Sequence, residues 1–393
     1  MKLQTLRVGF VPLVDAAPVI VAAEMGLDAE EGLDLELVRA PTWSLLRDMV
    51  SFGQVDAAHM LAPIPVAGVL GLGGTGKQLH ATAVMSINGN VVGVSRELAG
   101  RIRSAGHQFD FDDADAAGRA LIAAMGAEKL RIGVPFPFSM HAELVFYWLT
   151  ALGLPAPQSV DVRTVPPPLM AEALQAGEID AFCVGEPWGS RSVEAGFGEL
   201  LLPTSVIWAF APEKVLALTE DFIAQKRELT LRLVRTIWRA GRWLSDRQSH
   251  GLATEILSKS QYLSLDPELL ERALSGKLVI AQSGETREVS GFLDFYSGAA
   301  GFPWKSQAEW IASRIARRVG LELSTSMKAG MQTFRSDIYR AAMEGVAYDL
   351  PAASAKLEGA LLEPTAVGSL GGRLILPRDQ FFDGRIFEPS AGV

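Results

Sequence analysis

Four side chains in this sequence have the chemistry to hold a small anion. Lys214 precedes the apolar, strand-like stretch 215–218. An ammonium group beside a buried strand costs several kcal/mol unless a carboxylate or a bound anion pairs with it. His141 is predicted at the start of a helix, where free backbone N–H groups and positive potential favour an anion. Trp43 can lay a flat ring against a planar ligand, and Asn90 can supply an amide donor.

Each of these residues also has a plain structural explanation. A lysine after the turn 211–213 can be solvated, a single histidine is often a satisfied structural group, and Trp43 can belong to the core. The segment Asn88-Gly89-Asn90 first indicates a turn, although it also lies near the expected crossing between two lobes. These explanations stay open beside the hypothesis of a binding site.

The sequence lacks the motifs of the common enzyme and metal classes. It has no Gly-x-Gly-x-x-Gly after a strand, no Walker lysine motif, no Gly-x-Ser-x-Gly elbow and no His-Glu-x-x-His pair. The glycine-rich segment 70–77 looks like a phosphate loop but has the wrong spacing, so we interpret it as a turn that ends a helix. The five histidines are not at metal-ligand spacings, and one cysteine, Cys183, can build no thiolate cluster. We therefore expect no catalytic residue, no metal and no cofactor.

Length and charge narrow the classes of protein further. At 393 residues the chain is longer than a single core usually grows, so two domains are expected. The net charge of -9 and the lack of a Lys/Arg run argue against contact with nucleic acid. No apolar run reaches the roughly 18 residues of a membrane span. Residues 1–5 lead into a strand without the apolar region of an export signal. We expect a cytoplasmic protein, or a periplasmic one if a leader has been removed.

Strand-like and helix-like stretches alternate at the start of the chain. A strand at 6–12 is followed by a helix around 17–31, a strand at 33–38 and a helix at 43–52. Strands separated in this way pair in parallel through right-handed crossovers, which predicts doubly wound α/β lobes. Gly26 stands where a helix end favours positive φ.

The second lobe is expected to open at the strand 130–134, and the helix 228–245 is expected after the chain has returned to the first lobe. The C-terminal segment is expected to wrap the first lobe. This assigns residues 1–91 and 212–393 to lobe 1 and residues 92–211 to lobe 2.

An internal echo favours two lobes of one plan. The segment 52–57, FGQVDA, recurs in form as 176–181, AGEIDA, with the two aspartates 124 positions apart. Each segment indicates a helix end, a glycine and a strand, and each is followed by a proline-bearing loop, at 62–65 and 185–188. A helix end followed by glycine and a strand is common in proteins, so the inference of two similar lobes depends on the matched loops. We expect both loops to reach a shared crevice at the strand ends.

At these residues the sequence resembles the nitrate- and bicarbonate-binding proteins of ABC transporters and their cytoplasmic nitrate-sensor relatives. The matching stretches, in chain order, are FVPLVDAAPVIVAAEMGL, FGQVDAAHMLAPIPVA, LGLGG, NGN, FCVGEPWGSR, PEKVLALTE and FFDGRIFEP. They spread over most of the chain. The resemblance implies the type II periplasmic-binding-protein fold, with an anion held in a cleft between two doubly wound lobes, and no enzymatic activity.

The resemblance also implies which residues hold the ligand. Six positions match the family's pocket, namely Trp43, Asn90, His141, Pro167, Val184 and Lys214. Pro167 and Val184 would contribute backbone groups, and the other four would contribute side chains. Lysine at 214 favours nitrate or nitrite, because the bicarbonate binders place an acidic residue there.

Several functions are compatible with this resemblance. We first expect a nitrate or nitrite sensor that regulates nitrate assimilation by releasing an RNA-binding antiterminator partner when the ligand binds. The alternative is the solute-binding component of an ABC importer, whose partner would be a permease. A pyrimidine-forming enzyme of thiamin synthesis shares the fold, but those enzymes carry a cysteine-rich motif and this chain has one cysteine. A signalling role without a ligand is the last alternative.

Overall fold

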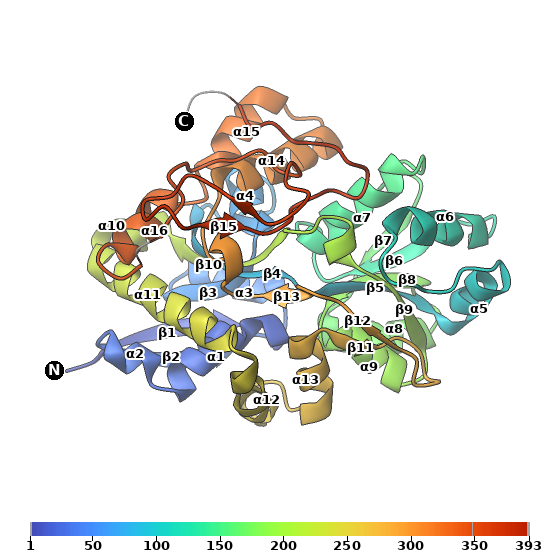
Figure 1. Ribbon diagram of the computed structural model, residues 1–393, viewed down its shortest axis with the longest axis horizontal. Helices are drawn as coiled ribbons and strands as arrows, with labels where there is room; N and C mark the ends of the chain where they lie inside the picture. The colour runs from blue at the N-terminus through green and yellow to red at the C-terminus, as the bar shows by residue number, and fades with distance from the viewer. Residues whose placement is uncertain (1, 348, 391–393) are drawn as a thin grey trace.

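The computed structural model describes residues 2–347 and 349–390, and most of its strands form two mixed sheets flanked by helices (Figure 1). The first sheet has the order β13-β4-β10-β3-β1-β2, and its strands are β1 Gln4–Phe10, β2 Leu33–Arg39, β3 Ala57–Leu61, β4 Leu79–Asn88, β10 Pro212–Thr219 and β13 Leu293–Asp294. The second sheet has the order β7-β6-β8-β5-β9, and its strands are β5 Asn90–Ser95, β6 Arg131–Val134, β7 Asp161–Thr164, β8 Ala181–Gly185 and β9 Gly198–Pro203. This architecture confirms the predicted α/β fold.

Strand direction is parallel in part of each sheet. β1 pairs in parallel with β2 and β3, and β6 pairs in parallel with β7 and β8, as predicted. By contrast, β10 is antiparallel to β3 and β4, and β5 is antiparallel to β8 and β9. β4 leads into β5 through Gly89 alone, which has a φ of 90° that glycine adopts easily. The chain returns to the first sheet through residues 204–211.

The helices surround the sheets in three groups. Around the first strands lie α1 Ala17–Glu24, α2 Leu27–Glu30, α3 Trp43–Ser51 and α4 Pro63–Val69. Along the chain, the helices that alternate with the strands of the second sheet are α5 Arg96–Ser104, α6 Ala114–Ala124, α7 Met140–Ala151, α8 Met170–Gln175 and α9 Trp188–Glu194. After β10 follow α10 Glu220–Gln225, α11 Arg227–Leu244, α12 His250–Ser258, α13 Pro267–Ser275, α14 Lys305–Val319, α15 Leu323–Met331 and α16 Ser336–Met343.

Short elements connect these larger ones. The 3-10 turns are η1 Val14–Ala16, η2 Pro167–Leu169, η3 Thr204–Val206, η4 Arg247–Ser249 and η5 Ser297–Ala299. Two small antiparallel ribbons pair β11 Lys277–Val279 with β12 Thr286–Glu288 and β14 Thr365–Ala366 with β15 Ile375–Leu376.

Helix positions follow from apolar spacing and from special backbone angles. In α11 the buried residues Leu233, Ile237 and Leu244 fall on one face, which packs against α1. The single helix expected at 17–31 is instead two helices, because Gly26 has a φ of 68° that ends α1 and starts α2.

Two further expectations about local structure need correction. Of the two proline-bearing segments expected as loops, 63–65 is the start of α4, whereas 186–187 forms a short turn between β8 and α9. Lys214 lies inside β10 rather than before it, because the ladder with β4 already includes Pro212.

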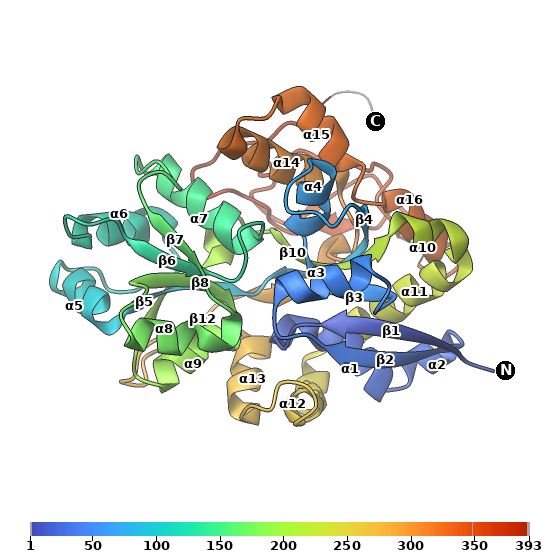
Figure 2. The same ribbon diagram turned by 180° about the vertical axis from the view of Figure 1, so that it is seen from behind.

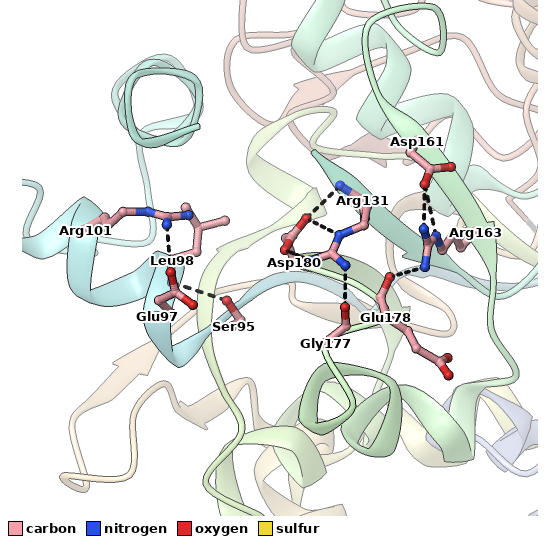
Figure 3. A network of polar contacts seen from close by, with 10 residues as sticks. All are labelled: Ser95, Glu97, Leu98, Arg101, Arg131, Asp161, Arg163, Gly177, Glu178 and Asp180. Atoms are coloured by element: carbon pink, nitrogen blue, oxygen red, sulfur yellow. Dashed lines mark hydrogen bonds and ion pairs between the residues drawn. The ribbon is translucent and has the colours of Figure 1, made fainter. Parts of the chain in front are cut away.

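The internal echo corresponds to a repeated structure. In the first sheet the backbone N–H of Arg7 donates to Asp56 over 2.8 Å, and the guanidinium donates to the Gly53 carbonyl over 2.9 Å. In the second sheet Arg131 makes the same contacts 124 positions later, donating to Asp180 through its backbone over 3.0 Å and through its side chain to the Gly177 carbonyl (Figure 3). The ladder Val8↔Ala57 likewise recurs as Ile132↔Ala181. The two sheets are therefore built on one plan.

The C-terminal segment reaches α7, which packs beside the second sheet, and the connector 204–211 between the two sheets. It runs from α16 across α14 towards α7 (red in Figure 1). The Tyr147 hydroxyl of α7 donates to Asp383 over 2.7 Å, and the Phe381 ring stacks on Trp208 with centroids 4.8 Å apart.

Within the described residues, no helix has both the length and the apolar character to cross a membrane. We keep lobe 1 (1–91 and 212–393) and lobe 2 (92–211) as an interpretation.

Candidate functional site

A buried lysine stands where the two sheets meet. Lys214 in β10 is 0% exposed, and its Nζ lies 2.7 Å from Asp15 Oδ2 and 2.7 Å from Glu213 Oε1. The expectation that this lysine needs a negative partner is therefore confirmed, and the solvated alternative is wrong. Two carboxylates, rather than one, meet the ammonium group.

Glu213 and Lys214 are neighbours, yet both side chains reach the same site. In a regular strand successive side chains point to opposite faces. Here the register of β10 against β4 shifts between Pro212 and Lys214 and again between Lys214 and Val215. Such an irregularity re-aims a side chain, which accounts for the shared direction.

Two more side chains, from β3 and from α3, lie around this ion pair. His59 in β3 lies with Nε2 3.0 Å from Asp15 Oδ1, and Asp15 itself belongs to η1. The Trp43 ring lies 5.5 Å from the His59 ring, and Lys214 Nζ is 5.4 Å from the Trp43 ring centroid. Trp43 is held at the first position of α3, where the Thr42 hydroxyl accepts the Leu45 N–H and caps the helix.

His141 from α7 and Asn90 from β5 complete the cluster. His141 is in the first turn of α7, which the Ser139 hydroxyl caps by accepting the Ala142 N–H. Its Nδ1 lies 3.4 Å from Glu213 Oε1. Asn90 is the first residue of β5, and its Nδ2 donates to Glu213 Oε2 over 2.6 Å. Seen from behind, α3 lies over β3 on one side of the molecule and α7 lies beside the second sheet on the other (Figure 2).

Val184 and Pro167 have different relations to this cluster. Val184 is buried in β8, one residue before Gly185, and Gly185 pairs with Asn90. A Cβ atom on Gly185 would lie 3.5 Å from Asp15 Oδ2, so the end of β8 borders the cluster. Pro167 is buried at the start of η2, beyond the edge strand β7. Within 2–347 and 349–390, no hydrogen bond or ion pair joins Pro167 to the residues around Lys214.

Burial and charge decide the ionisation of the cluster. Burial acts to raise the pKa of Asp15, but Lys214 and the His59 hydrogen bond outweigh it and lower that pKa to about 2. Burial acts to lower the pKa of Lys214, but Asp15 and Glu213 outweigh it and raise that pKa. Burial lowers the pKa of His59, and burial together with Lys214 brings the pKa of His141 well below its usual value. Near neutral pH, Asp15 and Lys214 are therefore charged and both imidazoles are neutral.

Buried donors without a partner surround the ammonium group. Trp43 Nε1 and both ring nitrogens of His141 are buried and make no hydrogen bond within the part of the chain that the structure describes. A neutral imidazole carries one N–H donor, and Lys214 keeps a third N–H after donating to two carboxylates. Leaving such groups unpaired costs free energy, so their arrangement suits a small ligand with several acceptor atoms.

Sequence reasoning missed Asp15, His59 and Glu213 as members of this cluster. Each stands in an apolar run, namely FVPLVDAAP, AAHML and APEKVLAL. For Asp15 and His59 the available signal was a single ionisable residue inside an apolar run, because such a group needs a partner once it is buried. For Glu213 the signal was its position next to Lys214. Metal binding finds no support in the described residues, where no group of three or more His, Cys, Asp or Glu side chains is placed to hold a metal ion.

Two similar proteins share long stretches with this chain. The nitrate import ATP-binding protein NrtC from Synechocystis sp. PCC 6803 is 32% identical over 314 residues, which cover 79% of this chain and 46% of NrtC. The nitrate/nitrite binding protein NrtA from Synechococcus elongatus is 29% identical over 403 residues, covering 99% of this chain and 84% of NrtA. The chain thus spans less than half of NrtC and most of NrtA.

A solved structure and a family model complete the comparison. The crystal structure of the periplasmic nitrate-binding protein NrtA from Synechocystis PCC 6803 matches with a TM-score of 0.83. The match is 24% identical and covers 99% of this chain and 96% of the other, which shows a shared fold. The model of the NMT1-like family matches residues 1–258, well over half of the chain. With this match and a fold shared from end to end, the chain belongs to the NMT1-like family.

Proposed function

We propose that this chain is the solute-binding component of an importer for nitrate or nitrite, and that the anion binds beside Lys214. One observation carries the proposal, namely that a buried ammonium group lies among unpartnered donors from α3 and α7. Nitrate is flat, singly charged and weakly hydrated, so one cation, an imidazole, an indole N–H and an amide supply a sufficient set of contacts.

The ligand-binding residues in this proposal are the six that the sequence resemblance implied. Trp43, His141, Lys214 and Asn90 lie in one cluster, and Val184 borders it. Pro167 keeps its assigned backbone role as a prediction only.

The relatives favour import over sensing. One relative is named as a nitrate import ATP-binding protein and another as a nitrate/nitrite binding protein. We accordingly propose ABC permease and ATPase components as partners and the periplasm as the location. The cytoplasmic sensor that releases an antiterminator, which we expected first, stays a second hypothesis. Co-purification with membrane components rather than with an RNA-binding protein would favour the importer.

Binding without catalysis also suits the cysteine. Cys183 is buried in β8, and burial raises the pKa of its thiol well above the usual value. A thiol in that state is a poor nucleophile, which counts against cysteine chemistry at this site.

Calorimetric titration with nitrate, nitrite and bicarbonate tests the proposal. We expect heat with nitrate or nitrite and little with bicarbonate. Trp43→Phe keeps an aromatic ring in place and removes the indole N–H, so it should weaken nitrate binding by about tenfold, the worth of one hydrogen bond to a charged group. Lys77→Met, at an exposed ion pair with Asp221, is the matched control and should bind like the unaltered protein. Binding of bicarbonate alone would refute the assignment.

A further inference from the structure

The Glu213 carboxylate lies beside three of the side chains that the proposed anion needs. Its Oε1 lies 2.7 Å from Lys214 Nζ and 3.4 Å from His141 Nδ1, and its Oε2 accepts from Asn90 Nδ2 over 2.6 Å. Lys214, His141 and Asn90 are three of the four side chains assigned to the ligand. An ionised Glu213 therefore offers these groups the same chemistry as a bound monoanion.

The net charge of the cluster also opposes the binding of a monoanion while Glu213 is ionised. Asp15 and Lys214 balance each other as an ion pair with Nζ and Oδ2 2.7 Å apart. An ionised Glu213 then leaves one net negative charge in a site where every one of these side chains is at most 2% exposed. A monoanion entering this site would meet a like charge at short range with little screening, which costs several kcal/mol.

We propose that Glu213 takes up one proton from solvent when a monoanion binds, so that its ionised carboxylate acts as an internal competitor and its carboxylic acid permits binding. The proton adds to a carboxylate oxygen, no other bond forms or breaks, and the site with its anion then carries the same net charge as the free site. The neutral acid can also donate its O–H, which adds a donor for the anion. This inference rests on the proposed function.

The neighbouring ionisable groups leave Glu213 as the proton acceptor. They are Lys214 on the same strand, Asp15 from η1, His59 from β3, His141 from α7 and Cys183 from β8. Lys214 and Asp15 hold their charges near neutral pH, and the Cys183 thiol keeps its proton. Burial raises the pKa of Glu213, so this carboxyl is the acidic group of the cluster that is readiest to protonate.

Nitrate is a suitable probe because it stays a monoanion throughout the accessible pH range. We would titrate the full chain with nitrate from about pH 5.5 to about pH 8.5, in pairs of buffers that differ in ionisation enthalpy. The difference in heat between paired buffers gives the number of protons taken up. The unaltered protein should take up close to one proton at the upper end, and its Kd should rise by up to about tenfold per pH unit.

Two variants test whether Glu213 is the group that takes up the proton when nitrate binds. Glu213→Gln keeps the side-chain size and removes the charge, so its nitrate Kd should be independent of pH and below that of the unaltered protein at high pH. Glu186→Gln is the matched control, since Glu186 is another buried glutamate whose pKa burial raises to about 7, and its carboxylate accepts from Ser190 N instead of the Lys214 cluster. This control should keep the pH dependence of the unaltered protein.

The outcomes separate this inference from the proposed function. Nitrate binding with no proton uptake, or an unchanged pH slope in Glu213→Gln, overturns the inference and leaves nitrate binding in place. An absence of nitrate binding at every pH overturns both. If Glu213→Gln fails to fold, the paired-buffer titration of the unaltered protein decides alone, because zero uptake excludes any protonation on binding.

Discussion

The Nζ atom of Lys214 lies 2.7 Å from Oδ2 of Asp15, and neither side chain is more than 2% exposed. This pair joins β10 to the turn η1 that follows β1. A buried charge without its partner is costly, so the pair ties two distant parts of the first sheet to one geometry. The stability of the fold and the proposed binding of an anion therefore depend on the same ammonium group.

Replacing Lys214 by methionine should lower the free energy of unfolding by about 3–5 kcal/mol, because it leaves Asp15 buried without its cation. Urea denaturation measures this loss. Lys77→Met removes an exposed pair with Asp221, whose side chains are 52% and 61% exposed, and should cost about 0–1 kcal/mol. Equal losses in the two variants would contradict the structural role of the buried pair.

Acid should weaken the contribution of Asp15 to stability. The pKa of Asp15 in the folded chain is about 2, below its ordinary value of 3.8, so the ionised form stabilises the fold above that ordinary value. This contribution is lost as the pH falls through the folded-state pKa. The difference in unfolding free energy between the unaltered protein and Asp15→Asn should thus shrink from about pH 6 to about pH 2.5. A difference that stays constant over this range would argue against the shifted pKa.

Tyr147→Phe should loosen the C-terminal segment from α7. The variant removes the hydrogen bond to Asp383, which is 2.7 Å long, and should cost about 1 kcal/mol in unfolding free energy. Limited proteolysis near residue 383 should also become faster. Tyr296→Phe is a control, since the Tyr296 hydroxyl makes no hydrogen bond among the described residues, and it should leave both measurements unchanged.

Gly93→Ala should disturb the centre of the second sheet. A Cβ atom at this position would lie 2.2 Å from Cζ of Phe182, so the ring must move, and we expect a loss of about 1–3 kcal/mol. Gly100→Ala lies on the exposed face of α5, where the new Cβ would meet no atom of the described residues within 4 Å apart from its own stretch of helix. That variant should gain about 0.5–1 kcal/mol, because alanine favours a helix. Thermal unfolding of both variants checks the contrast.

Much of the fold could be predicted from local patterns. Alternating strands and helices indicated the α/β class, and Gly26 marked a positive φ that the structure confirms. The echo of Asp56 in Asp180 predicted a repeated plan, which the matching contacts of Arg7 and Arg131 bear out. These features depend on residues close in sequence or on simple spacing, and so they can be seen without coordinates.

The environment of the lysine could be predicted only in part. The position of Lys214 beside an apolar strand showed that it needs a negative partner, since burial of an unpaired ammonium is costly. The sequence did not show which carboxylates would contact Lys214. Asp15 lies in the turn η1 after β1, far away in the chain, and the Glu213 side chain points to the same site because of a register shift between β10 and β4. Such a shift arises only when two distant strands pair.

By itself, then, the sequence determined the α/β class, the repeated plan and the need of Lys214 for a negative charge, because propensity, spacing and the cost of burial act locally. Only the tertiary structure decided that two carboxylates share this ammonium, that His141 of α7 and Asn90 of β5 meet Glu213 beside it, and that the C-terminal segment reaches α7. The physical reason is that each of these contacts joins residues far apart in the chain, whose approach depends on how whole sheets and helices pack.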